Sequence, residues 1–248
     1  MDLRKGFHEP VQKPRRFYSE VSVAAIEDGY VVLLDARQLK TPRAVQMRLP
    51  TRAVAEQVAA EWAGQGETIE LATMHATRLA NTAVETISAT RGGVADQIAE
   101  YAGSDLLCYF AESPSDLVTR QQRAWEPVLA RAEAEEALRF VRAAGIIHQQ
   151  QPPETPARIR EIALGLDDFR LAGLAFATPL FGSAVLAVGL LRGWFGGSEA
   201  YDLSRVDEIY QESLWGIDDE AAERVERLRG EATMLEQWFG GLAGYQVL

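Results

Sequence analysis

The chain has 248 residues, of which 47% are hydrophobic and 25% are charged, a composition typical of a globular protein that buries a core without disulfides or a structural metal. Its 25 basic and 36 acidic residues give a net charge of −11, which argues against binding to nucleic acid or to an anionic membrane surface. Cys108 is the single cysteine, so an internal disulfide and a four-cysteine zinc site are both excluded.

The first fifteen residues show no hydrophobic periodicity and contain two prolines, which predicts a mobile arm. Several basic residues lie here, but no apolar run follows them, so a secretory signal is not expected. The segment is also short, and it carries acidic residues that matrix-targeting peptides avoid. We therefore expect a bacterial cytoplasmic protein, or a mitochondrial matrix protein if the chain is eukaryotic.

Residues 17–49 have the pattern of a small antiparallel sheet. Two runs rich in β-branched and aromatic residues, one containing Val21 and Val23 and one at 30–34, flank the pair Asp28-Gly29. Glycine supplies the positive φ that a tight hairpin turn requires, so this pattern predicts a β-hairpin. Further extended segments are predicted at 38–41 and 45–49, which would continue the hairpin as a meander.

Helices are predicted from residue 51 onward. Thr51 can cap a first helix whose apolar face carries Val54, Val58 and Trp62 at a spacing of four. Gly92-Gly93 is expected to separate the next two helices. Segment 140–147 fits either a strand or a helix end. The remaining helices are predicted at 76–91, 94–109, from 117 past the internal Pro127, 157–177, 180–195, 198–214 and 218–240.

These elements predict an α+β fold in two parts. A small antiparallel β-rich N-terminal domain with one helix would cover residues 1–75. A larger, mainly α-helical domain would cover residues 76–248. The order of the elements supports this division, because strands come first and helices follow.

Residues 171–191 form a run of 21 residues without a charge, which is long enough to span a bilayer. Thr178, Pro179, Gly182 and Ser183 interrupt it, and proline disfavours helix in the residue before it. We therefore expect two shorter buried segments with a break near Thr178-Pro179, and a protein that is not embedded in a membrane. A membrane-attached protein remains the alternative.

No local motif for catalysis, cofactor binding or metal binding is present. The glycines at 193–197 lack the spacing of a nucleotide-binding loop, and the three histidines are too far apart in sequence for a metal pair. Cys108 lies in an apolar run, where a buried thiol is inert. We predict no catalytic residue, no cofactor and no metal. The alternative is a small-molecule enzyme whose site is built from dispersed residues such as Glu61, His75 and Asp105.

Six segments of the chain form a recognisable ordered set. They are LLDARQLKTP (33–42), AEWAGQ (60–65), TRLANTA (77–83), SDLLCY (104–109), QQRAWEP (121–127) and YQESLWG (210–216). Together they resemble one family, the assembly chaperones for the alpha subunit of the F-type ATP synthase catalytic head. The resemblance covers residues 16–240 and departs from the family at Ala36, where glycine is usual, and at His75, where proline is usual.

The resemblance implies a β-rich N-terminal domain, a helical C-terminal domain and no enzymatic activity. It further implies an ATP-independent chaperone that binds the free alpha subunit and shields its beta-facing surface until the alpha/beta hexamer assembles. Such surfaces are apolar and promote aggregation when exposed. We expect the chaperone to be a monomer.

The resemblance also indicates where the client would bind. In the family an acidic position precedes the Tyr-Gln-x-x-x-Trp-Gly motif, and here it falls on Asp207 and Glu208. Our hypothesis is that these carboxylates meet a basic group on the alpha subunit, with Glu212 and Trp215 completing the partner-binding set. The alternative for the carboxylates is a solvated helix face. Trp215 and Trp62 are also candidates for the core, because a tryptophan on an apolar helix face is usually buried.

Overall fold

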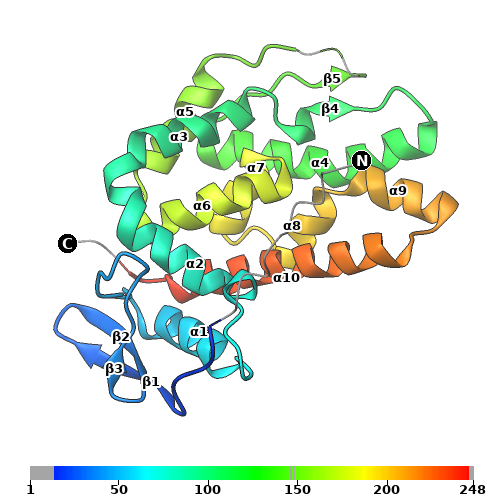
Figure 1. Cartoon of the computed structure of the whole chain (residues 1–248). Helices are drawn as coiled ribbons and strands as arrows, with labels where there is room; N and C mark the ends of the chain where they lie inside the picture. The colour runs from blue at the N-terminus through cyan, green and yellow to red at the C-terminus, as the bar shows by residue number, and fades with distance from the viewer. Residues whose placement is uncertain (1–13, 146, 148, 246–248) are drawn as a thin grey trace, which may run out of the picture.

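The computed structural model describes residues 14–145, 147 and 149–245 (Figure 1). A small sheet and the helix that covers it form one end of the molecule, and the rest is mainly helical. This is the α+β arrangement that the sequence predicts. Most of the arm predicted for residues 1–15 lies outside the described residues.

The sheet is antiparallel, in the order β1-β2-β3, with β1 at Val21–Ile26, β2 at Gly29–Leu34 and β3 at Arg37–Gln38. Gly29 has a φ of 133°, so the predicted hairpin turn is confirmed. The predicted meander is confirmed in part. Strand β3 continues the hairpin, and beyond it isolated antiparallel bridges join Lys40 to Gln46 and Tyr30 to Leu49. Ala44 adopts a left-handed turn conformation between the two predicted segments.

Helix α1 (Arg52–Ala63) packs against β1 and β2 and begins as predicted. The backbone N–H of Val54 donates to Oγ1 of Thr51 at 3.2 Å, which caps the helix. Val54, Val58 and Trp62 are buried on its inner face. The Tyr18 hydroxyl donates to the Trp62 carbonyl at 2.7 Å, which fastens the chain before the sheet to the end of α1.

A single long helix follows the short 3₁₀ turn η1 (Leu71–Thr73). It consists of α2 (His75–Thr82), the π-helical segment η2 (Ala83–Ile87) and α3 (Ser88–Ala102). The predicted break at Gly92-Gly93 is therefore wrong. Two glycines cost a helix only about 1 kcal/mol each, and α3 gains more by packing along α5 and α6. The helix also ends at Ala102 instead of continuing to 109.

The segment that follows leads into a second, two-stranded sheet. The 3₁₀ turn η3 (Leu106–Cys108) is followed by β4 (Tyr109–Phe110), which pairs in parallel with β5 (Ala143–Ala144). Part of the segment 140–147 is therefore a strand. Between β4 and β5 lies α4 (Ser115–Glu136), with Pro127 inside it.

The last six helices are α5 (Glu154–Leu164), α6 (Asp168–Phe181), α7 (Ala184–Leu191), α8 (Gly197–Leu203), α9 (Val206–Trp215) and α10 (Asp219–Gly241). Two predicted helices are each divided in two, by residues 165–167 and by residues 204–205. Residues 171–191 form two buried helices, as predicted. The break lies at Gly182-Ser183 and not at Pro179, because Gly182 has a φ of 63° and Ser183 caps α7.

Helices α6 and α7 pack against each other in the middle of the core. Within the described residues, no helix is both long enough and apolar enough to cross a membrane. Helix α10 runs back to the sheet end (Figure 1), where Oγ1 of Thr51 donates to the Gly241 carbonyl at 2.7 Å. The division of the chain into domains at residue 75 stays a prediction.

Candidate functional site

The candidate partner-binding residues all lie on α9, which is the most weakly embedded helix of the C-terminal part. It contains no buried residue and touches only α4 and α8 closely. Its first turn carries Asp207 and Glu208, whose negative charges favour the N-terminal end of a helix. Helix α9 is therefore a surface element of the chain.

The Asp207 carboxylate holds α9 against the body of the molecule. Its Oδ1 accepts a hydrogen bond of 2.6 Å from Nε2 of Gln121 on α4. Gln121 is itself buried, and its Oε1 accepts from the Ala111 N–H at 2.7 Å. The side chain of Asp207 is thus engaged inside the protein.

The Glu212 side chain also has a partner within the chain. It forms an ion pair with Arg205, the residue just before α9. The Arg205 guanidinium in turn lies over the Tyr201 ring, 5.4 Å from its centroid. Arg205 thereby joins the end of α8 to the middle of α9, and its positive charge offsets one of the acidic groups of the helix.

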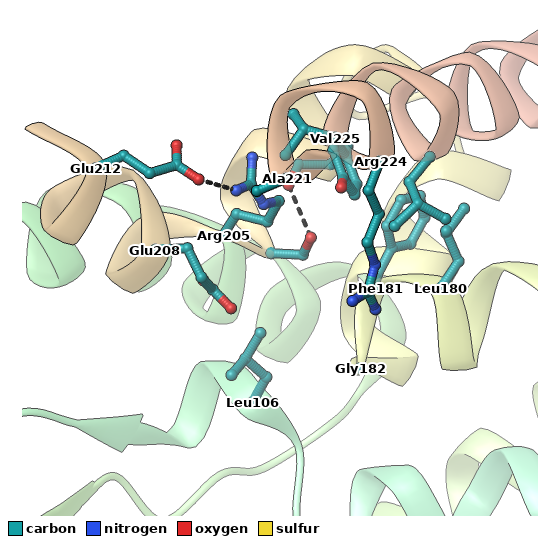
Figure 2. A pocket seen from close by; sticks show the side chains of 13 residues that line it. Leu106, Leu180, Phe181, Gly182, Arg205, Glu208, Glu212, Ala221, Arg224 and Val225 are labelled. Carbon is teal, nitrogen blue, oxygen red and sulfur yellow. Dashed lines mark hydrogen bonds and ion pairs between the residues drawn. The ribbon is translucent and has the colours of Figure 1, made fainter. Parts of the chain in front are cut away.

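A pocket of about 510 Å³ separates α9 from α10, and Glu208 and Glu212 form part of its wall. Leu106, Leu180 and Phe181 contribute apolar surface. Figure 2 shows Glu208 and Arg224 approaching the pocket from the two helices. Neither side chain forms a hydrogen bond or an ion pair with another residue in the described part of the chain, so both charges remain available to a partner.

Three exposed apolar side chains, the apolar tip, lie at the end of α9 and in the connection to α10. The tip consists of Leu214, Trp215 and Ile217, whose exposed fractions are 54%, 77% and 44%. The core position considered for Trp215 is therefore wrong, whereas that of Trp62, which is 8% exposed, is confirmed. Large apolar side chains that gather at one exposed point are typical of a protein-binding surface.

The structure therefore brings only part of the predicted set together. Glu208 and Glu212 share the pocket wall, Trp215 lies at the apolar tip, and Asp207 faces α4. Consecutive residues of a helix point about 100° apart, which separates Asp207 from Glu208. The sequence analysis did not select Arg224, Leu214 or Ile217. The apolar residues on both sides of Gly216 could have been noticed in the sequence as a candidate binding surface. Arg224 could not, because its position depends on how α10 packs.

Glu61 and His75 belong to the dispersed enzyme site considered as an alternative. Both form contacts within the fold. The Glu61 carboxylate accepts hydrogen bonds from the N–H groups of Ala76 and Thr77, at 2.7 and 2.8 Å, and caps α2. Burial raises the pKa of Glu61, although these hydrogen bonds oppose the shift. His75 Nε2 lies 3.9 Å from Oε1 of Glu231.

Asp105, the third member, is fully buried at the other end of the long helix. Its carboxylate accepts from the Ser183 hydroxyl at 2.7 Å and from the Val185 N–H at 3.1 Å, and burial raises its pKa to about 6. The carboxylate of Asp105 bonds residues at the start of α7, and no hydrogen bond or ion pair joins it to Glu61 or His75 within the described residues. The three groups thus do not meet in one site.

The described residues contain no cluster of three or more His, Cys, Asp or Glu side chains that could hold a metal ion. Cys108 is buried, as predicted, and burial raises the pKa of its thiol. A thiol in such surroundings stays protonated and inert.

Comparison with known proteins gives a consistent result. Residues 15–133 match the family model described as ATP12 chaperone protein. The chain is 24% identical to the mitochondrial protein atp12 of Schizosaccharomyces pombe over 229 residues, which is 86% of this chain and 78% of that relative.

Solved structures agree over a greater share of the chain. The crystal structure of Atp12 from Paracoccus denitrificans is 34% identical, with a TM-score of 0.84 over 92% of this chain and 97% of that one. That of the protein Atu1473 from Agrobacterium tumefaciens is 35% identical, with a TM-score of 0.85 over 92% and 86% of the two chains.

Proposed function

Because this chain belongs to the ATP12 family of ATP synthase assembly chaperones, we propose that the protein it holds is the free alpha subunit of the catalytic head. In this proposal the chaperone covers the alpha-subunit surface that later faces beta. It works as a monomer, without catalysis, in a bacterial cytoplasm or a mitochondrial matrix.

The observation that supports this role best is the combination found on and beside α9. The apolar tip of Leu214, Trp215 and Ile217 offers the contact that an apolar client surface requires. Glu208, in the first turn of the same helix, offers an unpaired carboxylate in the pocket wall. Apolar anchors with a charged rim are the usual composition of a protein interface.

Release of the client needs no ATP in this mechanism. A stable interface covers on the order of 1,000 to 1,600 Å², and the pocket and tip together would form only part of it. If the beta subunit binds the same alpha surface more tightly than the chaperone does, then it displaces the chaperone by mass action. The exposed position of α9 allows such an exchange at the edge of the interface.

Co-expression of the chain with the alpha subunit alone tests the proposal. Soluble alpha subunit should elute together with the chain from a sizing column, and beta subunit added afterwards should release the chain. If the alpha subunit precipitates to the same extent with and without the chain, then the proposed client is wrong.

A further inference from the structure

A groove of about 610 Å³ lies on the sheet end of the molecule, far from α9 (Figure 1). Phe17, Leu34, Leu39 and Trp62 supply its apolar lining. They come from the segment before β1, from β2, from the residue after β3 and from α1. The groove therefore exists only because α1 packs across the sheet, and it shares no lining residue with the pocket beside α9.

Two aromatic side chains of this groove lack the contacts that such groups normally have. The Phe17 side chain is 60% exposed although Tyr18, which it meets edge to face, is buried. The indole Nε1 of Trp62 is buried and has no hydrogen-bond acceptor among the described residues. Buried hydrogen-bond donors nearly always have an acceptor, so the unpaired indole N–H is unusual.

The charge of the groove is opposite to that of the chain. Arg37 and Lys40 line it and are exposed, although the protein as a whole carries a net charge of −11. Neither side chain forms an ion pair with a carboxylate within the part of the chain that the structure describes. The charge of Arg37 does contribute to the lowered pKa of Asp35. Lys40 has no such neighbour.

We propose that this groove binds an extended segment of a partner protein in which a carboxylate stands next to a large apolar side chain. The apolar side chain packs on Phe17 and Trp62, and the carboxylate pairs with Lys40 and Arg37. Trp62 lines the groove, so its indole N–H signal reports on occupation of the groove. The volume of the groove is within the range of sites that hold a few side chains.

The inference goes beyond the client-binding surface on α9 and does not depend on which client is held there. The two surfaces lie at opposite ends of the molecule (Figure 1). A chain with both can hold two segments at once, either of one client or of two different proteins. Linking two weak contacts in this way raises the overall affinity without strengthening either one.

The test follows the indole N–H signal of Trp62 in the full chain labelled with ¹⁵N. The chain has five tryptophans, and the signal is assigned by its loss in Trp62→Phe. The probe is an acetylated and amidated octapeptide in which two aspartates flank a Leu-Phe pair. A second peptide, with lysines in place of the aspartates, serves as the comparison. The aspartate peptide should shift the Trp62 signal saturably and the lysine peptide should not.

Charge reversal provides the matched control. The double variant Arg37→Glu with Lys40→Glu should weaken binding of the aspartate peptide by about tenfold and should favour the lysine peptide. Arg48→Glu alters an exposed arginine of the same N-terminal region that does not line the groove, and it should change neither. All three side chains are exposed, so folding should be unaffected.

Three results would overturn the proposal. The first is an aspartate peptide that leaves the Trp62 signal in place. The second is an equal response to both peptides, which would mean that the cationic groups do not select the segment. The third is a signal that shifts with the concentration of the chain alone, because a second copy of the chain would then occupy the groove.

Discussion

Asp207 and Glu208 are neighbours in the sequence, yet their side chains have different surroundings. Asp207 accepts from the buried Gln121 side chain, whereas Glu208 faces the pocket beside α10 without a partner in the described chain. The resemblance places the acidic position on these two residues and does not say which of them meets the client. The structure supports dividing the roles, with Asp207 stabilising the fold and Glu208 available for a client.

Asp207→Ala should lower the free energy of unfolding by about 1–3 kcal/mol, because the buried Gln121 Nε2 would lose its acceptor. Asp207→Asn keeps an acceptor oxygen and should lose less. Urea denaturation of both variants measures the difference. Equal stability of the alanine variant and the parent would show that the hydrogen bond contributes nothing.

Glu208→Lys should leave the urea midpoint unchanged and weaken capture of the alpha subunit by about fivefold, since one charge at an interface rim contributes roughly 1 kcal/mol. Affinity measured by titration of the purified alpha subunit, stabilised in solution, checks this. Glu100→Lys, an exposed carboxylate on α3, is the control. Equal loss in both variants would point to net charge and remove Glu208 from the site.

Asp105 should make stability depend on pH. Its pKa is raised to about 6 in the folded chain and is ordinary when unfolded, so the folded state binds the proton more tightly. The resulting stabilisation is full below the unfolded pKa near 4 and is lost as pH rises through 6, by up to about 3 kcal/mol.

Urea denaturation of the parent and of Asp105→Asn isolates this contribution, because other groups titrate equally in both proteins. We choose about pH 4.5 and about pH 7.5, which lie on either side of the pKa of Asp105. The free energy of unfolding of the parent, relative to that of Asp105→Asn, should be higher at the lower pH than at the higher pH. A difference that does not change with pH would show that Asp105 does not titrate in this range.

At the scale of elements, two glycines differ in what surrounds them. One lies inside a continuous helix and the other lies where two helices pack closely. Gly93 lies inside α3 with open space around it, so an added methyl group meets nothing within 4 Å. Gly197 begins α8, and a Cβ there would lie 2.0 Å from the Ala232 carbonyl oxygen on α10. Gly93 is therefore not required by packing, whereas Gly197 is required for the close approach of α8 to α10.

Gly93→Ala should raise the free energy of unfolding by about 0.5–1 kcal/mol, because alanine costs less backbone entropy in a helix. Gly197→Ala, the matched control, should lower it, because α8 and α10 would have to move apart. Thermal and urea denaturation measure both. If Gly93→Ala destabilises the chain, then the helix is not continuous through residues 92 and 93.

At the scale of the whole molecule, the two exposed surfaces lie far apart and are linked by α10. This helix starts beside the apolar tip and ends near α1, where Gln57 Nε2 donates to the Met234 carbonyl at 3.1 Å and Thr51 bonds to Gly241. A rigid helix between the two ends fixes their separation, which suits a protein that covers an extended client surface.

Trp215→Ser should leave the melting temperature unchanged, because the side chain has few contacts within the chain, and should reduce capture of the alpha subunit more than Glu208→Lys does. Buried aromatic anchors typically contribute 2 kcal/mol or more to an interface, roughly 30-fold in affinity. Trp62→Ser is the contrasting variant and should mainly lose stability. Full capture by Trp215→Ser would exclude the tip from the interface.

The sequence by itself determined the hairpin, the capped helix α1 and the buried pair of helices in residues 171–191. Local turn chemistry and hydrophobic periodicity are enough for these, since they depend on residues close together in the chain. The family was indicated separately, by the resemblance of six ordered segments. It also pointed to α9 through the Tyr-Gln-x-x-x-Trp-Gly motif, although it could not tell an engaged carboxylate from an available one.

Only the tertiary structure decided the continuity of the helix through Gly92-Gly93, the exposure of Trp215 and the different roles of Asp207 and Glu208. Each of these depends on a distant element: α5 and α6 for the helix, α4 for Asp207, and α10 for the pocket. The groove between Phe17 and Trp62 arises in the same way, because packing between distant segments creates surfaces that no local pattern encodes.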